Sequence, residues 1–370
     1  MSNLYDVVIV GAGPSGIGVG SLLKEMGCEN FVLLEKGQVG ESFRKWPKEM
    51  RFITPSFPAQ GFGQTDLNAI APKTSPAYSL DEEHPTGEDY AAYLNLVAKH
   101  FELPIEENTE VVSVLKEDGT FTIKTKEGEL HSKYVVWSGG EYQYPNRNPF
   151  PGANLGIHSS DVTAWKEMNG HEYIIIGGYE SGLDAAYHLC NQGADVKVIA
   201  RTNTWELDHS DPSVSLTPYT YNRLRNLPDS SKFQLIGNAS ATEVSMSGDQ
   251  YVVHTDQSTL YKSANPPIIA TGFSGSTKLI RNLVSYGQHG EVLLTEDDEF
   301  RKTPGIYLAG PEMRHGSHIF CYIYKFRQRY AVVATSIAKK LGLNQEILDL
   351  YRQENFILDD LSMCGERCQC

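Results

Sequence analysis

The sequence has no hydrophobic run long enough to cross a membrane. Its longest apolar stretches, such as residues 7–10 and 173–176, have the length of β-strands, whereas a membrane helix needs about 20 apolar residues. The N-terminal residues also lack the basic segment and the cleavage site of a secretory signal. We therefore expect a cytoplasmic protein that has no membrane partner.

Positive charge is also scarce in this chain. Lys and Arg number 32 against 46 Asp and Glu, which gives a formal net charge of −14. Without a basic stripe the protein cannot release counterions from a phosphate backbone, so we expect no nucleic-acid partner. The 370 residues are enough for two domains, each with a core of its own.

Cysteines are few, and they do not form the evenly spread framework of a secreted protein. Cys28, Cys190 and Cys321 are scattered, and the other three crowd the last seven residues. This distribution favours a reducing compartment.

The first motif follows an apolar strand over residues 6–10. Residues 11–16 read GAGPSG and lead into a helix-like stretch that ends near residue 26. In this pattern the first glycine permits the tight turn, the second lets backbone approach a pyrophosphate, and the third allows the helix to pack on the strand. An acidic residue 24 positions after the first glycine ends the next strand, where it can accept hydrogen bonds from a ribose diol. The predicted contacts of this dinucleotide site are Gly11, Gly13, Pro14, Ser15, Gly16 and Glu35.

The same pattern returns at residues 171–201. A strand over residues 173–176 leads into GGYESG at 177–182, and the next strand ends 24 residues after Gly177 at Arg201. A guanidinium at the ribose position can bind a 2′-phosphate through two hydrogen bonds, so this site predicts NADPH. Tyr179 stands where the middle glycine is usual, and we expect its side chain to crowd the pyrophosphate. The predicted contacts are Gly177, Gly178, Tyr179, Glu180, Ser181 and Arg201, with Thr271 and Gly272 at a later strand end.

The order of these motifs resembles the two-dinucleotide-binding flavoproteins, which include thioredoxin reductase-like enzymes and flavin-containing monooxygenases. A strand end at residues 138–140 precedes the second glycine motif, and the segment GIYLAG at 305–310 follows it. The resemblance covers most of residues 1–341 and implies FAD at the first site. Further FAD contacts implied by it are Lys36, Ser42, Phe43, Trp46, Thr54, Val111, Ser138, Gly139 and Gly310.

The resemblance implies an α/β fold with two Rossmann-like, three-layer domains, the NADPH domain being inserted into the FAD domain. We expect the FAD domain to comprise residues 1–152 and 273–343, the NADPH domain residues 158–272, and a tail residues 344–370. A helical run from about residue 319 to residue 341 should point its N-terminus at the pyrimidine edge of the flavin.

Two branches of the superfamily compete for this chain. Residues 39–46 are similar to the Gly-Gly-x-Trp stretch of the monooxygenase-like branch, but Pro55 replaces an asparagine that this branch carries. The disulfide-reductase branch carries cysteine pairs, and residues 37–60 contain no cysteine. A bacillithiol-disulfide-reductase-like subgroup lacks those pairs as well, and like this chain it has no Asp after the late glycine, where Pro311 and Glu312 follow Gly310.

We therefore expect an FAD-dependent NADPH oxidoreductase of the monooxygenase-like kind, whose flavin is reoxidised by oxygen or substrate. The alternatives are a reductase of small disulfides and a flavoprotein that senses redox state or metal. The partner is a small molecule or a small disulfide, and a homo-oligomer is left open. Arg314, His315 and His318 could contact the flavin or substrate, and the catalytic group is the flavin itself.

The remaining cysteines leave several interpretations open. Cys321 lies near the start of the late helix, where a thiolate could contact the flavin, although a buried small hydrophobe is the simpler interpretation. The terminal three could bind Zn²⁺ or Cu⁺, relay electrons or have no role. These three are Cys364, Cys368 and Cys370.

Overall fold

The computed structural model describes residues 4–57, 65–209, 211–228 and 232–361. The chain forms two units, each of which folds on itself. The first unit comprises residues 1–44, 55–141 and 275–370, and the second comprises residues 45–54 and 142–274. Each of the two units contains its own parallel sheet, as the α/β fold class predicts.

The sheet of the first unit is built on parallel strands in the order β3-β2-β1-β6, and β15 also pairs with β6. The central strand β6 pairs along one edge with β1, while its other edge is shared. Residues 129–132 of β6 pair with β5 in antiparallel fashion, and residues 135–137 pair with β15 in parallel. The strands are β1 (Leu4–Val10), β2 (Phe31–Leu34), β3 (Ile105–Glu106), β4 (Val111–Glu117), β5 (Thr120–Thr125), β6 (Glu129–Trp137) and β15 (Ile306–Leu308).

The apolar run in β1 reflects burial on both faces of this sheet. Val7, Val8 and Ile9 are each fully buried. A strand with one apolar and one solvent-exposed face would bury only every second side chain. Parallel pairing aligns the carboxyl ends of β1 and β2, so that Val10 lies opposite Leu34. The loops that follow these two strands therefore meet at one edge of the sheet, where ligands bind in folds of this class.

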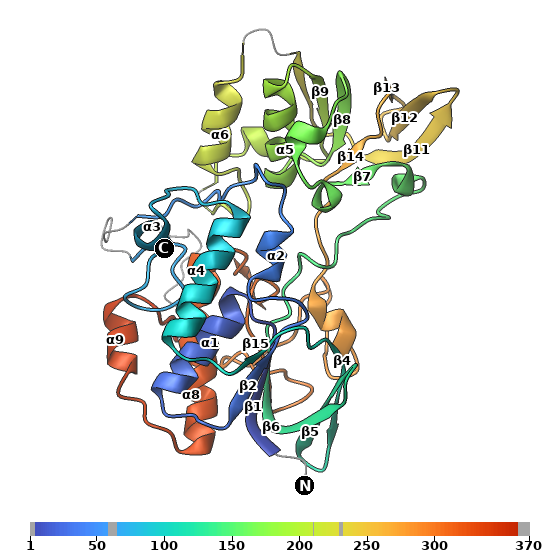
Figure 1. The fold of residues 1–370 in the computed structure, drawn as a ribbon. Helices are drawn as coiled ribbons and strands as arrows, with labels where there is room; N and C mark the ends of the chain where they lie inside the picture. The colour runs from blue at the N-terminus through green and yellow to red at the C-terminus, as the bar shows by residue number, and fades with distance from the viewer. Residues whose placement is uncertain (1–3, 58–64, 210, 229–231, 362–370) are drawn as a thin grey trace. The chain divides into compact units, whose positions relative to one another are not determined.

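Helices α1 and α8 of the first unit pack against each other, and α4 packs against α1 (Figure 1). Helix α4 begins with a capping box, in which Thr86 and Asp89 satisfy each other's backbone N–H groups. Helix α8 ends at Gly342, whose φ of 71° a glycine adopts without strain. The helices are α1 (Pro14–Glu25), α2 (Glu41–Arg44), α3 (Pro76–Leu80), α4 (Gly87–His100), α7 (Ile323–Phe326), α8 (Tyr330–Leu341) and α9 (Leu348–Gln353), with 3₁₀ turns η5 (Ser276–Ile280) and η6 (Arg327–Arg329).

The continuous helix expected over residues 319–341 is wrong in its first half. A small hairpin of β16 (Arg314–His315) and β17 (His318–Ile319) turns at Gly316, whose φ is 57°. The chain then passes through α7 and η6 before α8 begins at Tyr330. Contacts of residues distant in sequence stabilise this arrangement, and they are described below.

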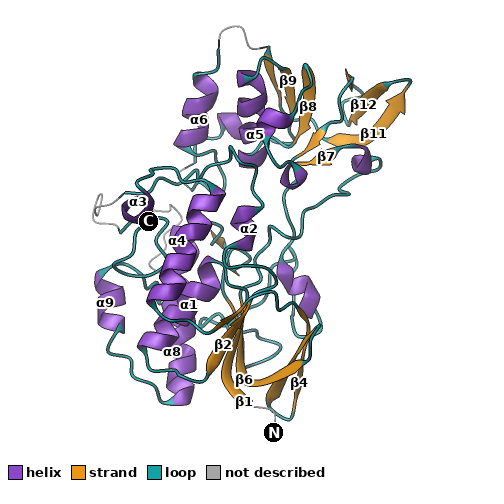
Figure 2. Ribbon diagram, in the orientation of Figure 1, coloured by secondary structure: helices purple, strands orange, loops and turns teal. Residues whose placement is uncertain are grey.

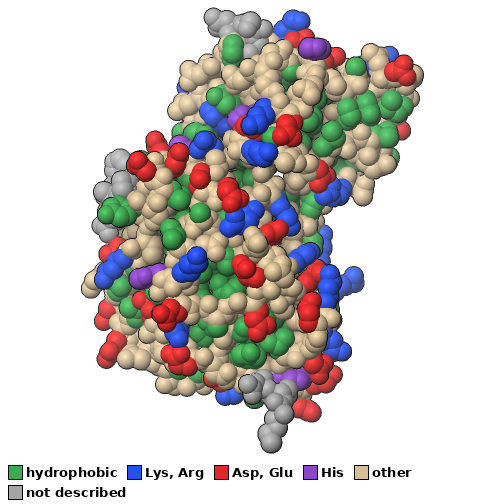
Figure 3. Space-filling model, viewed as in Figure 1, with side chains coloured by type: hydrophobic (Ala, Val, Ile, Leu, Met, Phe, Trp, Pro, Cys, Tyr) green, Lys and Arg blue, Asp and Glu red, His purple; other side chains and the backbone are tan. Residues whose placement is uncertain are grey.

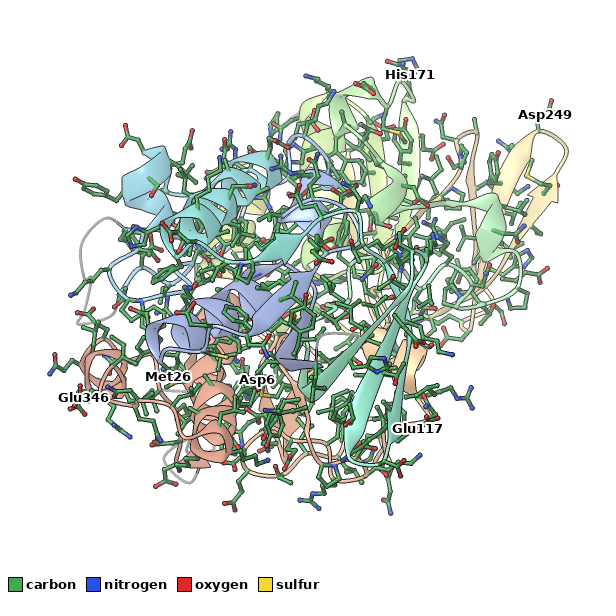
Figure 4. The ribbon with its side chains drawn as sticks, turned by 60° about the horizontal axis from the view of Figure 1, so that its bottom comes forward. Asp6, Met26, Glu117, His171, Asp249 and Glu346 are labelled. Atoms are coloured by element: carbon green, nitrogen blue, oxygen red, sulfur yellow. The ribbon has the colours of Figure 1, made fainter. Side chains whose placement is uncertain are left out.

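The second unit has a parallel sheet in the order β10-β9-β8-β14-β7 and a separate antiparallel sheet of β11, β12 and β13 (Figure 2). Asp249 lies at the tip of the turn between β11 and β12 (Figure 4). The parallel strands are β7 (Ile157–His158), β8 (Glu172–Ile176), β9 (Asp195–Ile199), β10 (Phe233–Ile236) and β14 (Ile268–Ile269). The other elements are α5 (Glu180–Asn191), α6 (Pro218–Arg225), β11 (Ala241–Ser247), β12 (Gln250–Thr255), β13 (Leu260–Ser263), and the 3₁₀ turns η1 (Ala153–Leu155), η2 (Ser159–Asp161), η3 (Trp165–Glu167) and η4 (Thr204–Glu206).

The limits of the second unit differ from the limits that we expected for the NADPH domain. The second unit begins at residue 142 and ends at residue 274, where we expected 158 and 272, and it also includes residues 45–54. The segment expected as a tail contains α9, which belongs to the first unit.

Within the described part of the chain no helix is both long and apolar enough to cross a membrane. Acidic and basic side chains are interspersed on the face shown in Figure 3.

Candidate dinucleotide sites

The first glycine turn joins β1 to α1, and its three glycines differ in their surroundings. Gly11 has a φ of 103°, and a Cβ there would lie 2.5 Å from the carbonyl oxygen of Ser138. A Cβ on Gly16 would lie 1.9 Å from the carbonyl oxygen of Gly11, so the helix packs directly on the turn. A Cβ on Gly13 would meet no protein atom within 4 Å. Open space at Gly13 is what the approach of a pyrophosphate requires.

Glu35 is held beside this turn. Its carboxylate accepts a hydrogen bond of 2.8 Å from the backbone N–H of Ala12 and one of 2.9 Å from that of Gly37. These bonds fix the carboxylate at the carboxyl end of β2, next to the N-terminus of α1. A carboxylate offers about four acceptor positions, so its chemistry suits the ribose diol predicted from the sequence.

Three further predicted residues gather around the same helix end. The Ser138 hydroxyl donates to the carbonyl oxygen of Val10 at 2.7 Å, which ties the end of β6 to the end of β1. Gly310, at the end of β15, has a φ of 128°, and a Cβ there would lie 3.2 Å from Ser15 Oγ. Gly139 is also constrained, because a Cβ there would lie 2.9 Å from Ser276 Oγ. The structure thus brings residues 11–16, 138–139 and 310 together.

Glu312 follows Gly310 but faces a different group. Its carboxylate accepts a hydrogen bond from the Thr277 backbone N–H at 3.2 Å and another from the Ser276 hydroxyl at 3.3 Å. It therefore caps the start of η5. Burial raises the pKa of Glu312, and the hydrogen bonds from Thr277 and Ser276 oppose this rise. The Glu312 carboxylate is thus held by Ser276 and Thr277.

The other predicted FAD contacts are spread more widely. Lys36 Nζ lies 3.1 Å from a carboxylate oxygen of Glu110, and Val111 begins β4 as a buried residue. Ser42 and Phe43 lie on α2, where the Phe43 ring meets that of Tyr90 edge to face. The last two, Trp46 and Thr54, belong to the second unit.

The second glycine turn, between β8 and α5, repeats the first. Gly177 has a φ of 118°, and a Cβ there would lie 2.1 Å from the carbonyl oxygen of Ala270. A Cβ on Gly182 would lie 1.9 Å from the carbonyl oxygen of Gly177. Gly178 is closely covered, since a Cβ there would lie 2.8 Å from the Trp205 ring. The backbone turn is therefore that of a dinucleotide site even though its middle glycine is absent.

The contacts of the Tyr179 side chain explain how this turn forms without its middle glycine. Its hydroxyl donates to the carbonyl oxygen of Ser215 at 3.0 Å and also to that of Pro212. Its ring packs against the buried cluster of the second unit that contains Leu183. The side chain is thus directed into its own unit, which gives a physical reason why a tyrosine is tolerated at this position.

Glu180 and Ser181 begin α5. The Glu180 carboxylate accepts a hydrogen bond from the Thr217 backbone N–H at 2.8 Å and another from the Thr220 hydroxyl at 2.5 Å. Burial raises the pKa of Glu180, against the lowering effect of these bonds. Glu180 thereby joins the start of α5 to that of α6. Tyr179, the N-cap residue of α5, makes no side-chain hydrogen bond to the start of that helix, so the first N–H groups remain directed at the turn.

Arg201 lies just beyond the end of β9 and is exposed. Within the described ranges its guanidinium has no carboxylate or carbonyl partner. After β14, the Thr271 hydroxyl donates to the carbonyl oxygen of Asn146 at 2.9 Å, and Gly272 has a φ of 78°. The predicted residues therefore follow the carboxyl ends of β8, β9 and β14, which are neighbours in one parallel sheet.

Sequence reasoning missed Asp184 on α5. Its carboxylate is buried and pairs with Arg223 at 2.7 Å and with His188 at 3.5 Å. The Trp165 ring N–H donates to it at 3.3 Å. Burial alone would raise the pKa of Asp184, but His188 and Arg223 together lower it. The i, i+4 spacing of Asp184 and His188 was the available signal.

A second missed network joins the segment before β15 to two segments that follow it. Asp298 is fully buried and accepts hydrogen bonds from Arg329 Nε at 2.9 Å and from His315 Nε2 at 2.5 Å. Arg329 also donates to the carbonyl oxygen of Leu358. This network fixes the β16–β17 hairpin and explains why residues 314–319 do not continue a helix. Its members are 17 and 31 residues apart, so no local pattern could reveal it.

The cysteines within the described ranges give no evidence of a thiol pair. Burial raises the pKa of both Cys28 and Cys190 to about 11, which makes them poor nucleophiles. Cys321 is partly exposed and precedes α7. No group of three acidic, His or Cys ligands occurs among the residues that the structure describes. The terminal cysteines, on which the metal and relay hypotheses depend, lie outside those residues.

Comparison with known families decides the superfamily. The model of the pyridine nucleotide-disulphide oxidoreductase family matches residues 8–310. The chain belongs to this family. The match runs from β1 to the end of β15 and thus spans both glycine turns. Flavin and nicotinamide cofactors are the pair that the family and its flavoenzyme neighbours imply.

Individual relatives are more distant. The uncharacterized oxidoreductase CzcO of Bacillus subtilis is 30% identical over 199 residues, which cover 51% of this chain and 53% of CzcO. The chain thus matches about half the length of this curated relative. Bacillithiol disulfide reductase Bdr of Staphylococcus aureus has a TM-score of 0.73 at 21% identity, over 91% of this chain and 99% of Bdr. A flavin-containing monooxygenase from Stenotrophomonas maltophilia has a TM-score of 0.68 at 16% identity, over 92% and 99%. Because both sequence identities are low, these two structures confirm the fold of the chain only.

Proposed function

We propose that this protein is an FAD-dependent oxidoreductase of the monooxygenase-like kind, which takes its electrons from NADPH. The observation that carries the proposal is the pair of glycine turns with opposite charges at the ribose position. Glu35 follows the first turn and Arg201 follows the second. The acid suits a ribose diol, and the cation suits a 2′-phosphate.

The first site fits FAD in its polar groups and in its space. Gly13 leaves room for a pyrophosphate, and as the N-cap residue of α1 it has no side chain to occupy the first N–H groups of the helix. Uncapped N–H groups and the positive end of a helix dipole stabilise phosphate oxygens. Gly13, Ser15 and Gly16 would therefore hold the pyrophosphate, and Glu35 would hold the adenosine ribose.

The second site fits NADPH for similar reasons. Tyr179, the N-cap residue of α5, makes no side-chain hydrogen bond to the start of that helix, and its hydroxyl is bound to the loop at residues 212–215. Arg201 is exposed, so no bond within the described residues has to break before it binds a phosphate. We propose that Arg201 distinguishes NADPH from NADH.

The bound flavin would supply the redox chemistry, accepting a hydride from NADPH and passing two electrons on. The chain's own part is to bind both nucleotides and to orient them. Without an organic substrate, NADPH, a proton and oxygen would give NADP⁺ and hydrogen peroxide. In a disulfide reductase, NADPH and a proton would instead convert one disulfide to two thiols. We favour oxygen and a small organic substrate because residues 39–46 are similar to the Gly-Gly-x-Trp stretch of the monooxygenase-like branch.

An anaerobic experiment separates these outcomes. The flavin is reduced with NADPH and then mixed with air-saturated buffer, with oxidised glutathione or with oxidised bacillithiol, and its reoxidation is followed by absorbance. We expect oxygen to reoxidise it and the disulfides to leave it reduced. Anaerobic reoxidation by either disulfide would contradict the proposal. A variant that ends at Leu361 would then show whether Cys364, Cys368 and Cys370 carry those electrons.

A further inference from the structure

A cavity of 520 Å³ lies in the first unit, apart from the residues assigned to FAD. Side chains of α3, of the C-terminal half of α4 and of the segment 65–75 form most of its wall. Its size is in the range of small-molecule sites, about 300–1,000 Å³. We infer that it is a second binding site, for a small amphipathic anion with an apolar body and one carboxylate.

The apolar part of the wall is unusually exposed. Phe57, Tyr78 and Leu96 line the cavity and are 40%, 81% and 53% exposed. Large apolar side chains that gather on an exposed concave surface indicate an interaction site. The ring of Tyr93 and the side chain of Val97, both buried, form the wall behind them. These five side chains would contact the apolar body of the ligand.

The polar part of the wall is held by internal bonds. Asp66 accepts hydrogen bonds from the Ser75 hydroxyl at 2.6 Å and from the Asn68 backbone N–H at 3.0 Å. The Thr74 and Tyr93 hydroxyls share a hydrogen bond of 2.7 Å. Beneath this wall the buried Arg327 donates to the carbonyl oxygen of Ala69 at 2.8 Å. The wall is therefore preformed, which lowers the entropic cost of binding.

Lys73 and His100 also line the cavity. Neither has a carboxylate within ion-pair distance among the residues described. Glu25 acts on both at longer range, and burial is the largest influence on the pKa of Glu25, which is raised. Glu354 also lines the cavity, but its carboxylate lies 3.1 Å from the Thr65 hydroxyl. The carboxylates of Asp66 and Glu354 are engaged by the Ser75 and Thr65 hydroxyls. Lys73 is the charged side chain of the wall with no such partner among the described residues, and it would bind the carboxylate of a ligand.

The backbone at Lys73 supports this inference independently. Its φ is 60°, a left-handed conformation that glycine or asparagine adopts with less strain. Among the described non-glycine residues with positive φ, it is the only cation. A lysine in a strained backbone conformation on a cavity wall is consistent with a role of its side chain in binding a ligand.

Fluorescence titration of the FAD-loaded protein with 8-anilinonaphthalene-1-sulfonate tests the inference. We expect one saturable site per chain, from which 1-naphthoate displaces the probe about tenfold more effectively than the uncharged 1-naphthamide. Lys73→Gln and His100→Gln should each weaken binding, and Leu96→Asp should abolish it. Lys262→Gln, a matched change of an exposed lysine on β13, should leave it unchanged.

Several results would overturn the inference. They are the absence of saturable binding, equal displacement by the two naphthalene competitors, unchanged affinity in Lys73→Gln, and displacement of the probe by NADP⁺. The inference does not rest on the proposed redox function. Reduction of the flavin by NADPH should remain normal in all four variants, and this measurement also shows that each variant is folded.

Discussion

Arg201 provides the sharpest test of cofactor choice. If its guanidinium binds the 2′-phosphate, removing it should cost one charge-assisted interaction, worth about 1.5–3 kcal/mol. That energy corresponds to roughly a tenfold to hundredfold change in affinity. Because Arg201 is exposed, salt screens part of the interaction, and we expect the lower end of this range near physiological ionic strength.

Stopped-flow reduction of the flavin by NADPH and by NADH, at several concentrations, gives the apparent dissociation constant of each. The unaltered protein should prefer NADPH, Arg201→Gln should lose the preference, and Arg201→Glu should repel the phosphate and favour NADH. Lys262→Glu changes the net charge of the second unit equally and should keep the preference. Equal constants for both nucleotides in the unaltered protein, or a preference that survives Arg201→Glu, would refute the assignment.

Three other predictions concern stability and site chemistry. Gly13→Val should abolish FAD retention while the circular dichroism spectrum stays unchanged, because the added carbon atoms face open space in the protein. Gly128→Val, also at an open glycine, is the control and should retain FAD. Full FAD occupancy in Gly13→Val would contradict the prediction. Asp184→Asn should lower the free energy of unfolding by about 3–5 kcal/mol at pH 7, because it leaves a buried cation unpaired. Because its partners lower the pKa of Asp184, the ionised carboxylate stabilises the fold at pH values above its unfolded pKa. The stability difference between the unaltered protein and Asp184→Asn should therefore shrink as pH falls below about 4. A difference that is independent of pH in urea titrations would exclude this explanation. Cys28 and Cys190, with pKa values raised to about 11 by burial, should resist iodoacetamide at pH 8 in the folded protein, and modification at the rate of a free peptide thiol would show that they are accessible.

The features that sequence reasoning predicted well are those specified by neighbouring residues. Gly16 and Gly182 pack on the backbone of their own turns, so the glycine spacing alone indicates both turns, although Gly11 and Gly177 also face the distant Ser138 and Ala270. Both parallel sheets follow from short apolar runs that recur after these turns. Tyr179 breaks the pattern, and only its contacts with Pro212 and Ser215 explain how the turn is kept.

Features that depend on distant contacts could not be predicted. Residues 319–341 have a helical composition, but Asp298 and Leu358 hold Arg329 and its neighbours in a different path. Glu312 stands close to an expected flavin contact in sequence, yet Ser276 and Thr277 supply its hydrogen bonds. In each case the partner lies at least 29 residues away, beyond any local periodicity.

The central claim is that two dinucleotides, one on each unit, exchange electrons within this chain. Anaerobic titration of the purified protein with NADPH tests it most directly, with the visible absorbance of the flavin as the readout. We predict about one FAD per chain, bleached by about one equivalent of NADPH, as a two-electron transfer requires. Purified protein that neither holds nor binds FAD, or bound FAD that NADPH fails to bleach, would contradict the account.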